Sequence, residues 1–405
     1  MELNWKKNTI LFISGQAITL FGSMIVQFAI FWHIVLITQS GTMMSVFTVA
    51  GFLPMFFISP FGGVWADRFN RKYLINIADS IIALVSLVVA ILLMLGYTHF
   101  GILLACVIIR SFGQGVQTPA VGAVIPQIVP KEYLTRINGI QSSIQSICML
   151  ASPMLSAVLM TITSLENLFF LDVFTAAIGI SILVFFVKVP SPAGTDDEKM
   201  GIAYFHELRQ GLKYIRENGY IFRLMILSAF FMVFAAPAAM LTPLHVIRKF
   251  GDDIWRLTAI EVAFSAGMIA GGILIGLWGG FKNRIFTIAF SCFIFGLTTM
   301  GFGLMPNFWL YVGIMAVAGI AMPLYNTPIM VLFQSTVEPA FMGRVLSVFN
   351  MVSSAVMPMA MLLFGPISDV VNIDILLIIT GILTLLLCIP FLSSKVLREA
   401  GKISE

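Results

Sequence analysis

The sequence predicts an all-α membrane protein with twelve transmembrane helices. Of the 405 residues, 59% are hydrophobic and only 10% are charged, whereas soluble domains carry about 25% charged residues. Apolar runs long enough to cross a bilayer core of roughly 30 Å recur along the whole chain. Lipid offers the backbone no hydrogen bonds, so these runs must form helices, because the short alternating strands of a membrane barrel are missing.

The apolar runs divide evenly about one long polar break. The predicted helices lie near residues 9–37, 43–66, 73–95, 101–127, 137–162, 167–187, 220–246, 256–280, 285–304, 307–333, 344–366 and 373–393. We therefore predict an N-terminal six-helix bundle over 1–189, a linker over 190–219 and a C-terminal six-helix bundle over 220–405. The linker contains an amphipathic stretch near 205–215, which we expect to lie along the cytoplasmic membrane surface.

The basic residues give the orientation. If the N-terminus is cytoplasmic, all but four of the 23 Lys and Arg residues fall on the inner side. The exceptions are Arg110 within a helix and Arg248, Lys249 and Arg256 outside. Cytoplasmic loops carry an excess of Lys and Arg, so both termini of this multi-pass membrane protein are predicted to be cytoplasmic.

The two halves carry a similar stretch. Thr-Pro at 118–119 is followed by Val-Pro and then Arg136, and Thr-Pro at 327–328 is followed by Val-Glu-Pro and then Arg344. Each stretch spans the predicted inner turn between the fourth and fifth helix of its half. Internal repeats of this kind are typical of transporters, whose binding site lies between the halves.

The most specific motif lies between the second and third predicted helices. It reads G-x-x-x-D-R-x-x-R-K, with Gly63, Asp67, Arg68, Arg71 and Lys72 at its fixed positions. A basic inner loop alone would satisfy the charge rule, but the spacing of the glycine and the aspartate is more specific than charge. The spacing therefore indicates a specific loop and not merely a basic one.

This loop resembles the signature loop of the major facilitator superfamily. Asn70 stands where that family usually has glycine, and we expect the turn to survive because Asn tolerates positive φ better than most residues. The stretch 110–115, Arg-Ser-Phe-Gly-Gln-Gly, resembles the superfamily's fourth-helix motif. The resemblance implies two pseudo-symmetric six-helix bundles and a transporter that is not an enzyme. It also implies that the loop is a gating loop, to which the nearby Asp79 belongs.

More narrowly, residues 51–54, 78–79 and 118–120 resemble the drug:proton antiporter branch that contains the macrolide-efflux transporters. This resemblance implies a location in a bacterial cell membrane and export of a hydrophobic drug, with a macrolide antibiotic favoured, by proton antiport and alternating access. The proton motive force would drive such antibiotic efflux. Tetracycline pumps are a related alternative.

Two ionisable residues inside helices are the candidates for proton coupling. Charged residues are unfavourable in lipid by about 2.5–3.5 kcal/mol on insertion scales, so they usually have a function. Glu261 is a carboxylate well inside the eighth helix, and Arg110 lies near mid-membrane in the fourth. The alternatives are a Glu exposed at a helix end and an Arg held structurally by backbone carbonyls.

Polar stripes on helices that resemble the superfamily's cavity-lining helices predict a wet substrate cavity. Such residues either line a cavity or hydrogen-bond between helices. The candidates are Gln16, Ser23, Gln27, Gln114, Gln117, Gln141, Gln145, Asn326 and Asn350.

Several classes of function find no support. The sequence has no phosphate-binding loop, zinc-protease motif or nucleophile elbow, so we expect no ATP-driven pump, no hydrolase, no metal and no cofactor. The net charge of +4 is too small for binding nucleic acid by bulk charge. The expected partners are a small-molecule substrate, protons and the lipid bilayer, with the protein a monomer. Export of a siderophore, lysolipid or metabolite, or a role as a membrane sensor or scaffold, stays open.

Overall fold

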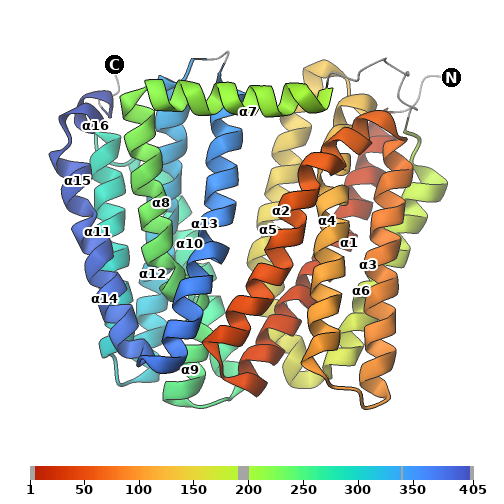
Figure 1. The fold of residues 1–405 in the computed structure, drawn as a ribbon, viewed down its shortest axis with the longest axis horizontal. Coiled ribbons are helices and arrows are strands. Elements are labelled where there is room, and N and C mark those ends of the chain that lie inside the picture. Colours follow the sequence, from red (N-terminus) through yellow and green to blue (C-terminus); the bar gives the residue numbers. More distant parts are fainter. Residues whose placement is uncertain (1–4, 190–199, 339–340, 402–405) are drawn as a thin grey trace. The chain divides into compact units, whose positions relative to one another are not determined.

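The protein is helical throughout the described residues, 5–189, 200–338 and 341–401 of this computed structural model (Figure 1). Within these residues, twelve helical stretches are long and apolar enough to cross a membrane, which confirms the predicted number. Their bounds agree with the predicted runs to within a few residues. The third, for example, covers Arg71–Met94 where the sequence predicts 73–95.

The helices gather into two compact units. The first unit contains α1 (Trp5–Thr38), α2 (Gly41–Arg68), α3 (Arg71–Met94), α4 (Phe100–Ile128), the short η1 (Lys131–Tyr133), α5 (Leu134–Ile162), α6 (Leu165–Ser181) and a π-helical turn, η2 (Ile182–Phe186), except for residues 38–45 between and at the ends of α1 and α2. Helix α3 packs against both α4 and α6. A buried apolar cluster that includes Phe12, Ile75 and Val124 joins α1, α3 and α4 at one end of the unit.

The second unit contains the remaining helices. They are α7 (Met200–Glu217), α8 (Gly219–Met240), α9 (Thr242–Phe250), α10 (Ile254–Trp278), α11 (Arg284–Leu304), α12 (Phe308–Thr336), α13 (Met342–Val370), α14 (Ile373–Leu386), α15 (Cys388–Ser393) and α16 (Lys395–Ala400). Helices α8 and α9 form one candidate span, broken at Leu241. Pro243 lies in the first turn of α9, where its missing N–H is tolerated.

Glycines allow the closest helix contact in this second unit. A Cβ on Gly267 of α10 would lie 2.0 Å from the carbonyl oxygen of Ala316 on α12, and one on Gly319 would lie 2.2 Å from that of Phe264. No other residue fits at either position. The α10–α12 pair is therefore held at a backbone-to-backbone distance that small residues permit in membrane helices.

Part of the predicted linker is a helix. The described part of 190–219 is mostly α7, which contacts α8 and α13 and runs across their ends (Figure 1). The ring of Tyr214 stacks on that of Phe341 with centroids 4.4 Å apart. A Cβ on Gly211 would lie 3.1 Å from the Cβ of Arg344. The amphipathic stretch is thus anchored to the second unit by packing; residues 190–199 lie outside the described part.

Asparagine side chains begin several of the helices. At an N-cap they accept hydrogen bonds from the otherwise unpaired backbone N–H groups of the first turn. Asn70 is one of them: its Oδ1 accepts from the backbone N–H of Lys72 at 3.0 Å, and its φ is −63°. The sequence-based reason for tolerating Asn70 in place of glycine was therefore wrong. Asn70 is suited to this position as a helix cap, with no need for a positive φ.

Candidate functional site

The first unit contains a buried charge network centred on Arg110 of α4. The Arg110 side chain is fully buried, and its Nη1 pairs with the Asp172 carboxylate of α6 and with Ser86 of α3. Its Nη2 donates to the backbone carbonyl of Ser23 on α1 at 3.0 Å. The hydroxyls of Ser86 and Ser23 donate to the two oxygens of Asp172 at 2.7 and 2.9 Å.

This network ties four helices together through one ion pair. Both charges are removed from water, and such a pair is tolerated when hydrogen bonds satisfy most of the remaining donors and acceptors. Here the buried Nε of Arg110 has no hydrogen-bond partner among the described residues. The sequence predicted Arg110 and Ser23 as coupling and cavity residues, but the structure places both in this closed network. Asp172 and Ser86 are its unpredicted members. The available signal was that Asp172 is an intramembrane charge of the sign opposite to Arg110.

A cavity of about 110 Å³ lies in the same unit between α1, α4 and α5. Four of the predicted cavity residues line it, namely Gln16, Gln117, Gln141 and Gln145. The rest of its wall is mainly apolar, with Phe12, Leu20 and Ile144 among the lining residues. An apolar wall with a few amide groups is the usual composition of a small-molecule site.

Behind this cavity lies the buried carboxyl of Asp79 on α3. Asp79 is 1% exposed, and its Oδ1 accepts a hydrogen bond from Nε2 of Gln117 at 2.9 Å. The same Nε2 lies 3.3 Å from Oε1 of Gln16. Gln117 therefore connects the cavity wall to an acid that the cavity lining does not include.

The basic residues of the signature loop hold backbone carbonyls within the first unit. Arg71 donates to the carbonyl oxygens of Ala66 at 2.7 Å and Ala123 at 2.6 Å, which fixes the α2–α3 turn to α4. Lys72 donates to those of Val184 and Val187 at the end of η2.

The other predicted gating residues differ in surroundings. Arg68 is exposed, and a Cβ on Gly63 would meet no atom within 4 Å. The side chain of Asp67 lies outside the described part of the structure. Asp79 makes its hydrogen bond to Gln117, away from the loop.

The remaining predicted residues are dispersed. Gln27 is half-buried beside Gly51, whose Cβ position lies 3.3 Å from the Gln27 amide nitrogen. Gln114 is half-buried on α4. Asn326 on α12 and Asn350 on α13 are exposed on their helices.

Glu261 is half-buried on α10 in the second unit. Within the described residues its carboxylate has no cation within ion-pair distance and no hydrogen-bond donor. It thus differs from an acid placed for structure, such as Asp172.

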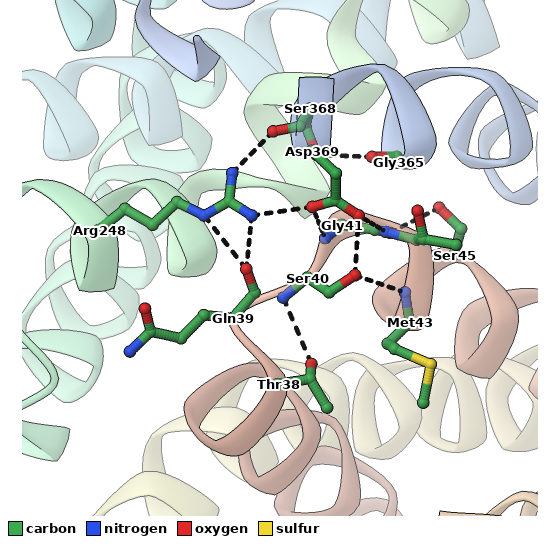
Figure 2. Close-up of polar contacts among 11 residues, drawn as sticks. Thr38, Gln39, Ser40, Gly41, Met43, Ser45, Arg248, Gly365, Ser368 and Asp369 are labelled. Atoms are coloured by element: carbon green, nitrogen blue, oxygen red, sulfur yellow. Dashed lines mark hydrogen bonds and ion pairs between the residues drawn. The ribbon is translucent and has the colours of Figure 1, made fainter. Parts of the chain in front are cut away.

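A second polar cluster holds the connection between α1 and α2, and by its contacts this connection (residues 38–45) belongs to the second unit. Figure 2 shows Asp369 of α13 at its centre. The carboxylate accepts from the backbone N–H groups of Gly41 and Thr42 at 2.8 and 2.9 Å, and from the Ser40 hydroxyl at 2.7 Å. Asp369 therefore caps the first turn of α2, where an acid is favourable.

Arg248 of α9 completes this cluster. Its guanidinium pairs with Asp369 at 2.8 Å and donates to the carbonyl oxygens of Gln39, at 3.1 Å from Nε, and Ser368, at 2.7 Å (Figure 2). One cation thus fixes both the connecting segment and the end of α13. This is the side predicted to face away from the cytoplasm.

The residues that the structure describes contain no group of three His, Cys, Asp or Glu side chains that could hold a metal ion. A smaller cluster joins His245 and Lys249 of α9 to Asp374 of α14, at 2.8 and 2.6 Å. Like the Arg248–Asp369 pair, it attaches α9 to a neighbouring helix.

Comparison with known proteins identifies the class. The model of the Major Facilitator Superfamily matches residues 12–361. The chain belongs to this superfamily, so it is a multi-pass secondary transporter and not an enzyme. Its fold is also that of a solved bacterial homologue of the human lysosomal transporter Spinster in an inward-facing, unoccupied conformation. The TM-score is 0.72 at 13% sequence identity, covering 100% of this chain and 99% of that chain.

Two curated relatives align over nearly the whole chain. Macrolide efflux protein A of Streptococcus pyogenes is 32% identical over 388 residues, which are 95% of each chain. The staphyloferrin A transporter of Staphylococcus aureus is 24% identical over 94% of each chain.

Proposed function

We propose that this transporter exports a hydrophobic drug, with a macrolide antibiotic favoured, across a bacterial cell membrane in exchange for protons. The similarity to macrolide efflux protein A supports the cargo, because it extends over 95% of both chains. The glutamine-lined cavity of the first unit supports a site that combines apolar walls with a few hydrogen-bonding groups.

Proton exchange requires a carboxyl that is free to gain and lose a proton. Glu261 meets this condition best in the second unit, because the described residues place no cation or hydrogen-bond donor on it. Arg110 does not meet it, since its guanidinium is committed to Asp172. We therefore propose Glu261 as a proton carrier and Arg110 as a structural residue.

The test compares Glu261→Gln with the unmodified transporter in liposomes under a pH gradient. We expect the variant to insert normally but to lose uphill macrolide transport. Glu217→Gln, on the exposed face of α7, is the matched control and should transport normally. Full pH-driven transport by Glu261→Gln would refute the role of Glu261 as a proton carrier.

The cargo has a separate test. Overexpression in a macrolide-sensitive bacterium should raise resistance to macrolides, and an uncoupler should abolish the effect. A change only for tetracycline would redirect the proposal to that drug. No change for either would favour export of a siderophore, lysolipid or metabolite, and purified protein that moved none of these would favour a sensor or scaffold.

A further inference from the structure

The buried acid Asp79 makes no hydrogen bond or ion pair with the described residues of the signature loop or of the Arg110 network. We propose that Asp79 is a proton-binding residue coupled to the glutamine-lined cavity, and that the transported substrate is an amphipathic cation. The inference rests on the proposed proton antiport and names the chemical class of its cargo.

The first support is the absence of a neutralising charge. Three other acids in candidate spans are paired with cations: Asp172 with Arg110, Asp369 with Arg248, and Asp374 with Lys249. Over the described residues, Asp79 has no cation within ion-pair distance. Its Oδ1 accepts a hydrogen bond from the neutral amide of Gln117, beside which the neutral amide of Gln16 lies, and its buried Oδ2 has no hydrogen-bond partner there.

The elements packed around Asp79 place no compensating charge on it in the described residues. Helices α4 and α6 pack against α3, η2 touches it, and α1 supplies Gln16. Their titratable side chains in the described residues are Lys6, Lys7, His33, Cys106, Arg110, Glu166 and Asp172, together with Arg71, Lys72 and Tyr73 on α3 itself. None lies within ion-pair or hydrogen-bond distance of Asp79, and the guanidinium of Arg110 is bound to Asp172.

An isolated buried carboxylate is strongly unfavourable, and such a group remains neutral by holding a proton. The site therefore stores a proton while no positive charge is near. A cation bound in the cavity would supply the missing charge, so the Asp79 O–H bond could break and the proton pass to cavity water. Proton and cation would then exclude each other, which is the requirement for antiport.

Few groups separate Asp79 from the glutamine-lined cavity. Gln117 contacts Asp79 and also lines the cavity, as does Gln16, which lies next to the Gln117 amide. These two amide groups thus connect the acid to the space that a cationic headgroup could occupy. The amides carry no charge of their own, so they position the acid without neutralising it.

The first experiment measures binding of the macrolide erythromycin, which carries a basic amine, to purified protein at about pH 6 and about pH 7. Displacement of one proton predicts affinity that rises with pH by up to about tenfold per pH unit. We expect Asp79→Asn to bind with little pH dependence, Asp79→Glu to restore it, and the exposed control Asp252→Asn to match the unmodified protein. Unaltered pH dependence in Asp79→Asn would overturn the proposal.

A second measurement does not depend on the drug. The infrared spectrum of the unmodified, membrane-reconstituted protein should contain the C=O stretch of a protonated carboxylic acid. The spectrum of Asp79→Asn should lack this band. Erythromycin should remove this band from the unmodified protein. If the band is lost in Asp79→Asn but no macrolide binds, the proposed cargo fails and the proton site stands. If Asp79→Asn leaves the spectrum unchanged, the proton site itself fails.

Discussion

At two positions along helix α4, a side chain of that helix binds a buried acid, one with a charge and the other without. Arg110 and Gln117 are seven residues apart, so they lie on the same face about 10 Å from each other. Arg110 binds Asp172 with a full positive charge and two serine hydroxyls complete the network. Gln117 gives Asp79 a single neutral hydrogen bond, and a cavity lies on its other side.

This difference distinguishes an acid with a structural role from an acid that can bind and release a proton. An acid held by a buried cation stays charged, since losing that charge would leave the cation uncompensated. An acid held by an amide has no such constraint, so its proton can respond to what enters the cavity. Burial of an intramembrane acid therefore indicates little about function until its partner is known.

The largest effect is expected when the Arg110–Asp172 ion pair is disrupted. Asp172→Leu leaves a buried guanidinium unpaired and should lower the free energy of unfolding by about 3–5 kcal/mol. Thermal unfolding of the detergent-purified variant, or its loss from the membrane, measures this effect. Asp79→Asn, beside Gln117, replaces a neutral acid by a neutral amide and should change stability far less. Equal losses of stability for both variants would contradict the distinction between the two acids.

A double variant sharpens the same comparison. Arg110→Met combined with Asp172→Leu removes both charges, and replacing a buried pair by apolar residues is often neutral. The double variant should therefore be more stable than Asp172→Leu alone. Additive losses would mean that the two side chains contribute independently and not as a pair.

An intermediate effect is expected for Asp369, whose partner is also a cation but whose side chain is 25% exposed. Asp369→Ala removes the cap of α2 as well as the contact with Arg248, and loss of a cap costs about 1–2 kcal/mol. Thermal unfolding should place this variant between Asp172→Leu and Asp79→Asn. Asp252→Ala, at an exposed position, is the control and should match the unmodified protein.

The smallest effect is expected for Gln117→Leu. It removes one hydrogen bond to Asp79, which is worth about 1 kcal/mol. Gln114→Leu on the same helix is the matched control, because Gln114 makes no hydrogen bond in the described residues, and it should cost less. A Gln117→Leu loss as large as that of Asp172→Leu would show that Asp79 is charged and needs this donor.

Much of the fold could be predicted from the sequence, and the candidate site only in part. Four glutamines predicted to line a cavity do line one, because a polar residue repeated at helical spacing in an apolar helix must face protein or water. The Arg110–Asp172 pair joins residues 62 positions apart, and no local pattern connects them. Asp79 and Asp172 look alike in sequence, since each is one acid in an apolar helix.

The sequence by itself determined the number of helices, because bilayer thickness and backbone hydrogen bonding act on each segment separately. Only the tertiary structure decided which acid has a cation beside it. That depends on how α3, α4 and α6 pack, and helix packing brings together side chains that are distant in sequence. The partner of each buried charge, and hence the division between structural and working acids, is a property of the folded chain.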